Sequence, residues 1–172
     1  MKRKKTWELV TMGLLAAIVF VVQVALGFLP NIELVTFLFI VYTLVLGKRV
    51  FLIIYVFVFL EGFFYGFGIW WINYLYVWTI EALITLALRK QTSVLFWSVM
   101  SGIYGFTFGA WCAIPYFFIG GPSAAFSYWI SGIPYSVLNC VGNIVICLVL
   151  FKPLYKILNM IWKGMDRNRL SR

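Results

Sequence analysis

Four polar side chains interrupt otherwise apolar sequence, and their types could support ligand binding. Glu33 follows Pro30-Asn31, whereas Glu61, Glu81 and Asn143 lie inside long apolar runs. A charged side chain at the centre of a bilayer costs at least ~2.5–3.5 kcal/mol, so such residues face other helices or a cavity. No Lys or Arg lies within these runs. The carboxyl groups therefore need either a proton and a hydrogen-bonding partner or a ligand that offers donors.

Aromatic and amide side chains lie at helical spacing from these residues. Tyr74 and Trp78 precede Glu81 by seven and three positions, which places all three on one helix face. Apolar walls with a few placed polar groups are typical of a small-molecule site. We therefore predict a binding site, open to the outside, formed by Glu33, Glu61, Tyr65, Trp71, Asn73, Trp78, Glu81, Trp129, Tyr135, Asn139 and Asn143.

The lack of cations in this set restricts the ligand. Carboxylates and phosphates normally bind Arg, Lys or a helix N-terminus. A neutral or cationic ring-bearing ligand with amide or hydroxyl donors fits better. Two alternatives stay open: Glu61 and Glu81 could form interhelical hydrogen bonds only, and the aromatic residues could belong to interfacial belts or packing.

Metal, catalytic and nucleic-acid chemistry are disfavoured. The chain has no histidine, and its three cysteines, Cys112, Cys140 and Cys147, lie in apolar sequence without a CxxC pair. The only aspartate, Asp166, lies in the basic tail, so a nucleophile would depend on the glutamates as bases. There is no Walker A motif. We expect a protein that is not an enzyme, holds no metal and no permanent cofactor, and does not bind nucleic acid.

The composition indicates the elements that would position this site. The 172 residues are 64% hydrophobic and 11% charged, with a mean hydropathy of +1.00. A soluble domain has about half apolar and a quarter charged residues. The 14 Lys and Arg residues are clustered, and stretches of 42, 39 and 61 residues between the clusters contain none. This pattern predicts an integral membrane protein and excludes a soluble enzyme, a disulfide scaffold and a disordered chain.

The apolar runs predict an all-α bundle of six transmembrane helices, as one transmembrane domain over residues 1–172. The expected helices cover about 9–29, 32–46, 50–67, 74–88, 94–118 and 132–151. With both termini cytoplasmic, every Lys and Arg lies on the cytoplasmic side, as the positive-inside rule requires. On the first helix, Gly13 and Ala17, with Ala16 alongside, form a small-xxx-small step that would let a partner helix approach closely.

With these features, the chain resembles the S component of an energy-coupling factor (ECF) vitamin transporter. The S component is the substrate-binding membrane subunit. The resemblance covers nearly the whole chain, through the size, the six expected helices and several motifs. These motifs are Thr11-Met12-Gly13-Leu14-Leu15-Ala16-Ala17, Pro30-Asn31-Ile32-Glu33-Leu34, Gly120-Gly121-Pro122-Ser123, Ile133-Pro134-Tyr135 and Gly142-Asn143. In that family an AxxxA motif on the first helix docks onto a coupling subunit, and here Gly13 replaces the first alanine.

The resemblance implies a function and partners. The chain would capture a vitamin outside a bacterial cell, in the plasma membrane, for import driven by two partner ATPases through a transmembrane coupling subunit. Cobalamin is the first choice of vitamin, because a large, amide-rimmed molecule suits carboxylates and Trp faces. Riboflavin, pyridoxine and a pyrimidine are the alternatives. A structural membrane scaffold of related six-helix fold, without a ligand, is the competing interpretation.

Overall fold

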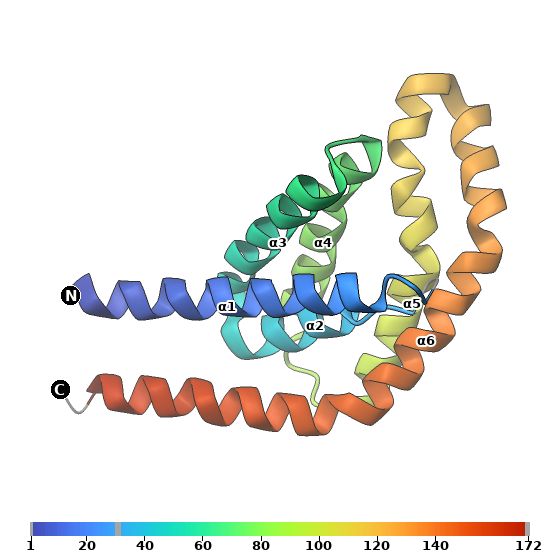
Figure 1. Cartoon of the computed structure of the whole chain (residues 1–172). Helices are drawn as coiled ribbons and strands as arrows, with labels where there is room; N and C mark the ends of the chain where they lie inside the picture. Colours follow the sequence, from blue (N-terminus) through green and yellow to red (C-terminus); the bar gives the residue numbers. More distant parts are fainter. Residues whose placement is uncertain (1, 30–31, 171–172) are drawn as a thin grey trace.

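The structure, a computed structural model, describes residues 2–29 and 32–170, which form helices joined by short connections and contain no strand. The helices are α1 (Lys2–Leu26), α2 (Val35–Leu46), the 3₁₀ turn η1 (Gly47–Arg49), α3 (Val50–Tyr65), α4 (Ile69–Leu88), α5 (Val94–Cys112) and α6 (Ile114–Leu170) (Figure 1). Pro30 and Asn31, which the sequence places between the first two predicted helices, lie outside the described residues. The predicted all-α class is confirmed.

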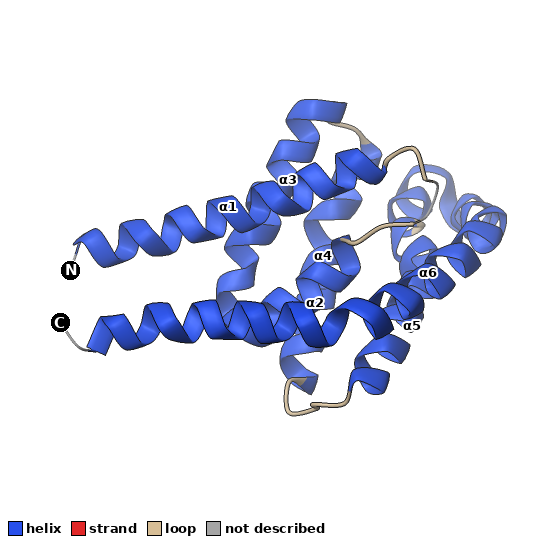
Figure 2. Ribbon diagram, turned by 60° about the horizontal axis from the view of Figure 1, so that its bottom comes forward, coloured by secondary structure: helices blue, strands red, loops and turns tan. Residues whose placement is uncertain are grey.

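Five helical stretches are long and apolar enough to cross a membrane. They are Thr6–Leu26, Val35–Tyr65, Ile69–Leu88, Val94–Cys112 and Ile114–Gly164, where α2, η1 and α3 count as one stretch. This is compatible with a multi-pass membrane protein. Six separate crossings and the cytoplasmic position of the termini stay predictions. Both ends of the chain lie at the same end of the molecule (Figure 2).

Two predicted connections are shorter than the sequence suggested, and each contains a glycine with positive φ. The fourth helix begins at Ile69 instead of residue 74, so Trp71 and Asn73 are helical. The break before it contains Gly66, whose φ of 85° is a left-handed conformation that glycine adopts freely. The predicted loop over 119–131 is helical except at Gly121, where φ is 76° and the chain reverses direction between α5 and the long part of α6.

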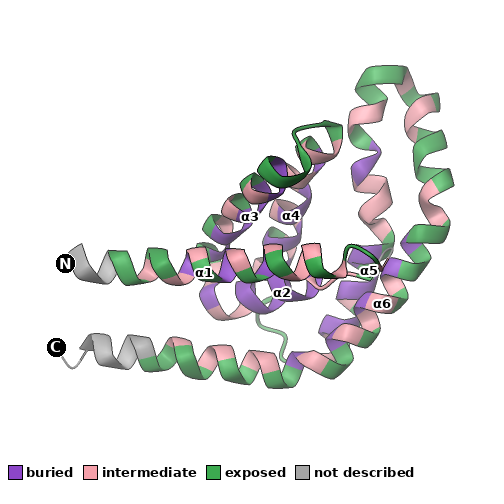
Figure 3. Cartoon of the chain, in the orientation of Figure 1, coloured by how far each residue is buried: buried purple, intermediate pink, exposed green. Residues whose placement is uncertain are grey.

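Helix α2 forms the centre of the core. Ten of its 12 residues are buried, on every side of the helix, which is typical of a fully enclosed element (Figure 3). An aromatic cluster continues this core, since the ring of Phe39 lies 5.6 Å from that of Phe57 and 5.5 Å from that of Trp78. The core thus holds α4, and with it Trp78, against α2 and α3.

An arginine connects three elements at the end of the molecule that carries the termini. Arg49 in η1 places Nη2 3.5 Å from Oε1 of Glu8 on α1. Its guanidinium carbon also lies 5.3 Å from the ring centroid of Trp162 on α6, a cation–π contact. Arg49 therefore links α1, η1 and the C-terminal part of α6.

Candidate functional site

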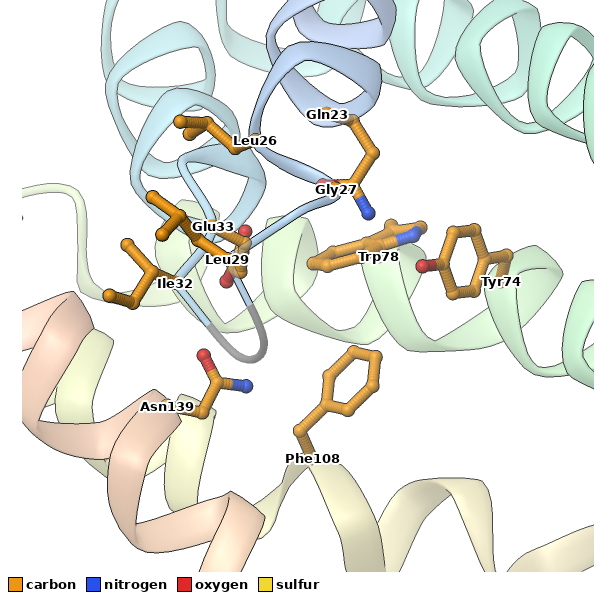
Figure 4. A pocket seen from close by; sticks show the side chains of 10 residues that line it. All are labelled: Gln23, Leu26, Gly27, Leu29, Ile32, Glu33, Tyr74, Trp78, Phe108 and Asn139. Atoms are coloured by element: carbon orange, nitrogen blue, oxygen red, sulfur yellow. The ribbon is translucent and has the colours of Figure 1, made fainter.

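A cavity of about 230 Å³ lies where α1, the α1–α2 connection, α4, α5 and α6 meet. Figure 4 shows Glu33 and Gln23 on one side of it, Trp78 and Tyr74 along α4, and Phe108 and Asn139 facing them from α5 and α6. We call this space the first cavity. Its described lining is Gln23, Leu26, Gly27, Leu29, Ile32, Glu33, Tyr74, Trp78, Phe108 and Asn139.

Glu33 is the one carboxylate in this lining, and it is fixed by three hydrogen bonds. The backbone N–H of Thr36 donates to Oε2 at 2.9 Å, and the hydroxyl of Thr36 donates to Oε1 at 2.5 Å. The third donor is Nδ2 of Asn143, 3.3 Å from Oε1. Since Thr36 lies in the first turn of α2, Glu33 also satisfies a free N–H at a helix N-terminus, where negative charge is favourable.

The surroundings of Glu33 act on its pKa in two opposite directions. Burial raises the pKa of the Glu33 carboxyl, whereas the hydrogen bonds from Thr36 and Asn143 lower it, and the net shift is upward from the ordinary value. Among the described lining residues there is no Lys or Arg that could offset the cost of burial. A cationic or donor-rich ligand would supply the missing compensation.

Two asparagines extend the polar wall along α6. Nδ2 of Asn143 donates to Oδ1 of Asn139 at 3.2 Å as well as to Glu33, and Asn139 itself lines the cavity. Among the described residues, Oδ1 of Asn143 and Nε1 of Trp78 are buried without a hydrogen-bond partner. Buried polar groups are normally paired. These two atoms therefore mark unused hydrogen-bonding capacity next to the cavity.

Aromatic rings form another part of the wall of the first cavity. Trp78 is 2% exposed, and its ring lies 5.4 Å from that of Tyr74 and 5.5 Å from that of Phe108. The rings of Tyr74 and Trp78 meet edge to face at 80°, the geometry that the aromatic quadrupole favours. These rings offer faces and edges to a planar ligand, opposite the polar atoms of Glu33 and Asn139.

Three of the eleven predicted binding residues line the first cavity, and a fourth supports it. Glu33, Trp78 and Asn139 line it, and Asn143 lies behind Glu33. Tyr135 lines a different cavity, between α5 and α6. The structure does not bring the remaining six predicted residues into the first cavity; they are Glu61, Tyr65, Trp71, Asn73, Glu81 and Trp129.

Two of these six residues make hydrogen bonds between helices instead. Nε1 of Trp71 donates to the carbonyl of Val58 at 2.9 Å and so ties α4 to α3. Nδ2 of Asn73 lies 3.5 Å from the carbonyl oxygen of Cys112, which ties α4 to α5. Glu61 and Glu81 are each 2% exposed and do not line the first cavity. Tyr65 and Trp129 are exposed.

A row of glycines on α5, which the sequence interpretation missed, lets α6 approach closely enough to place Asn143. A Cβ atom on Gly105 would lie 2.6 Å from Nδ2 of Asn143, and one on Gly109 would lie 2.9 Å from Oγ of Ser136. On Gly102 it would meet Cγ1 of Ile144 at 2.5 Å. These glycines are spaced three and then four residues apart, so they lie on one face of α5. Small residues at this spacing are a sequence signal that could have identified the α5–α6 interface.

The three small residues on α1 face different ways. Ala16 is fully buried in the bundle, whereas Gly13 and Ala17 are half-buried. A Cβ atom on Gly13 would have no neighbour within 4 Å. Ala16 therefore packs inside the chain, whereas Gly13 and Ala17 are partly accessible.

Comparison with protein-family models, with curated proteins and with solved structures finds no match to this chain. Function is therefore inferred from the chemistry of the site. Within the described residues, no group of three or more His, Cys, Asp or Glu side chains is placed to hold a metal ion.

Proposed function

We propose that this chain is the substrate-binding S component of an ECF vitamin transporter in a bacterial plasma membrane. The observation that carries the proposal is the first cavity, in which a fixed carboxylate faces aromatic rings between long apolar helices. Cavities with apolar walls and few, well-placed polar groups bind small molecules. A structural scaffold would account for the hydrogen bonds of Glu33 to Thr36 and Asn143, but it has no need for the open space beside them.

The cavity favours a small ring as the ligand over cobalamin. Drug-sized ligands occupy ~300–1,000 Å³, and the first cavity, at about 230 Å³, lies below that range. A corrin with its amide rim and axial groups is larger than such ligands. The acceptor oxygens of Glu33 and the absence of Lys or Arg from the described lining suit a neutral or cationic ring that donates hydrogen bonds. Pyridoxine-type and pyrimidine-type ligands meet both conditions.

The proposed transport cycle depends on partner subunits. The chain contains no Walker A motif, so ATP would be hydrolysed by two partner ATPases. A transmembrane coupling subunit would dock against Gly13 and Ala17 on α1, where small side chains permit close helix contact. The chain itself would bind the vitamin and would not act as an enzyme.

Mass spectrometry of small molecules that co-purify with the detergent-solubilised chain tests this proposal. We expect a ring-bearing, uncharged or cationic metabolite in the wild type, and its loss from the Glu33→Gln variant. Titration calorimetry with the identified compound should then show at least about tenfold weaker binding to Glu33→Gln, equivalent to 1.4 kcal/mol.

The matched control is Glu81→Gln, which changes a buried carboxyl that does not line the cavity. Its affinity should stay within about twofold of the wild type, well inside one factor of ten. If no small molecule accompanies the folded wild type and none of the candidate vitamins binds it, the scaffold interpretation is favoured.

A further inference from the structure

A second cavity lies beside the first, between α5 and α6. Its volume is about 360 Å³, and its described lining includes Cys112, Tyr128 and Tyr135. Phe108 and Asn139 line both cavities, one from each helix. The two spaces are therefore neighbours that share two side chains as a common wall.

The second cavity differs from the first in its chemistry. Its described lining contains hydroxyl groups, on Ser131, Ser136 and the two tyrosines, but no Asp, Glu, Lys or Arg. Hydroxyl groups both donate and accept hydrogen bonds. A charge enclosed without an opposite charge or several hydrogen bonds is costly, so this space suits an uncharged polar group.

Three glycines line the second cavity: Gly105, Gly109 and Gly132. Gly105 and Gly109 let α5 and α6 pack closely, whereas a Cβ atom on Gly132 would have no neighbour within 4 Å. One tyrosine of the wall is held in place from behind, because the ring of Tyr128 stacks on that of Tyr116 at 4.2 Å and 19°. One wall of the cavity thus contains a stacked tyrosine, and there is open space at Gly132.

We propose that the two cavities hold two parts of one ligand: a donor-bearing ring beside Glu33, and an uncharged, hydroxyl-bearing substituent between α5 and α6. This inference rests on the proposed function and specifies its substrate class. The first cavity alone is smaller than a drug-sized ligand requires, and the two cavities together fall within the usual ~300–1,000 Å³. Because Phe108 and Asn139 line both cavities, the two spaces lie side by side, and a ligand that occupies both would have to pass these two side chains.

Two pairs of probes test this inference by titration against the purified full-length chain. Riboflavin and lumiflavin share the isoalloxazine ring, and lumiflavin carries a methyl group where riboflavin carries its polyhydroxyl chain. Cytidine and cytosine share a pyrimidine ring, and only cytidine carries a ribose. In the wild type, we expect at least one two-part probe to bind about tenfold more tightly than its bare ring, a difference of 1.4 kcal/mol.

The decisive variant is Gly132→Leu, because Gly132 lines the second cavity and a Cβ atom there would have no neighbour within 4 Å. It should abolish the preference for the two-part probe and leave the affinity for the bare ring within about twofold, far less than a factor of ten. The matched control is Gly164→Leu, the same exchange at an exposed helix position with open space around it and outside both cavities. The control should bind all four probes like the wild type.

A second variant keeps the test valid if Gly132→Leu does not fold. Tyr135 is 57% exposed, so Tyr135→Phe removes one hydroxyl of the second cavity with little effect on packing. It should weaken only the two-part probe. The inference of a two-part ligand is overturned if the wild type binds the bare ring and the two-part probe with equal affinity. It is also overturned if these variants lose affinity for both probes equally. In either case the proposed function stands. If none of the four probes binds the folded wild type, the two-part ligand is rejected, and the proposed function fails for flavin and pyrimidine ligands.

Discussion

Nδ2 of Asn143 lies 3.3 Å from Oε1 of Glu33, so two residues 110 positions apart join α6 to the start of α2. The contact orients the carboxylate beside the first cavity and places an amide behind it. It also depends on Gly105, since any larger residue there would occupy the place of the Asn143 amide. The position of the candidate site's carboxylate is thus set by an interhelical contact and by helix capping together.

We predict that Asn143→Ala destabilises the protein and weakens ligand binding. The exchange leaves Oε1 of Glu33 with one donor fewer in a buried setting, and removing one partner of a buried hydrogen bond costs about 1–3 kcal/mol. Thermal unfolding in detergent should show a lower Tm than for Asn159→Ala, an exchange on α6 at a half-buried position outside the lining of both cavities. Equal Tm values for both variants would show that the Asn143–Glu33 contact contributes no stability.

We predict that Glu33 makes stability depend on pH in a defined direction. Because the folded state raises the pKa of this carboxyl, the folded protein binds the proton more tightly than the unfolded chain does. The stabilisation from this group is therefore complete below the ordinary glutamate pKa and is lost as pH rises through the raised value. The Tm of the wild type should fall with rising pH relative to that of Glu33→Gln. A constant difference between the two Tm values across that range would show that the shift is absent.

We predict that Gly105→Ala disrupts the α5–α6 interface although it adds only one methyl group. The new Cβ atom would lie 2.6 Å from Nδ2 of Asn143 and 3.1 Å from backbone atoms of Asn139, so a helix must move. Inserting a methyl group into packed structure typically costs about 1–3 kcal/mol. Gly132→Ala is the control, because its Cβ atom enters open space. A Tm for Gly105→Ala as high as that of Gly132→Ala would mean that the two helices are not held at this distance.

The contribution of Trp78 to ligand binding is best tested with a conservative substitution, because this residue both lines the first cavity and packs in the core. Its ring packs against Phe39 and Phe57 as well as Phe108, and truncation of a buried tryptophan to alanine costs about 3–5 kcal/mol. Trp78→Phe keeps an aromatic ring but removes Nε1, which has no hydrogen-bond partner among the described residues. We expect it to fold and to bind the ligand about tenfold more weakly, or 1.4 kcal/mol, by calorimetry. Unchanged affinity would assign Trp78 to packing alone.

The all-helical class was predictable from the sequence because hydropathy and charge clusters are properties of single segments. The structure confirms that class and shows five stretches able to cross a membrane. The helix boundaries at Ile69 and around Gly121 were less accurate, because a short break that contains a glycine with positive φ can replace the longer loop that composition suggests. Helical spacing placed Trp78 and Glu81 on one face, yet only Trp78 reaches the cavity.

The rest of the site could not be read from single helices. The role of Glu33 depends on Thr36 and on Asn143 of a distant helix, and no local pattern specifies that pairing. Phe108 and Gln23 line the first cavity. In the sequence, Phe108 cannot be told from other apolar residues, and Gln23 is a single polar residue in an apolar helix. Which faces of α1, α4, α5 and α6 point at the same space depends on how the helices pack.

The last prediction concerns the partner surface on α1. Gly13 and Ala17 lie one helical turn apart and are half-buried, while Ala16 is fully enclosed. If the coupling subunit docks here, a Leu side chain on Gly13 or Ala17 would separate two helices that need close backbone approach. We therefore expect Gly13→Leu and Ala17→Leu to abolish vitamin uptake in cells that supply the partner subunits. The purified variants should still bind the vitamin when alone, because neither residue lines a cavity.

Ala16→Leu distinguishes docking from packing. Its side chain would enter the core, where overpacking costs about 1–3 kcal/mol, so it should lower the Tm of the solitary protein. Gly13→Leu should leave the Tm unchanged, since a Cβ atom there meets nothing within 4 Å. Co-purification with tagged partner subunits then provides the readout: the Gly13 and Ala17 variants should lose the complex. Full uptake by both would place the docking surface elsewhere, and loss of binding by the solitary variants would make these residues core contacts instead.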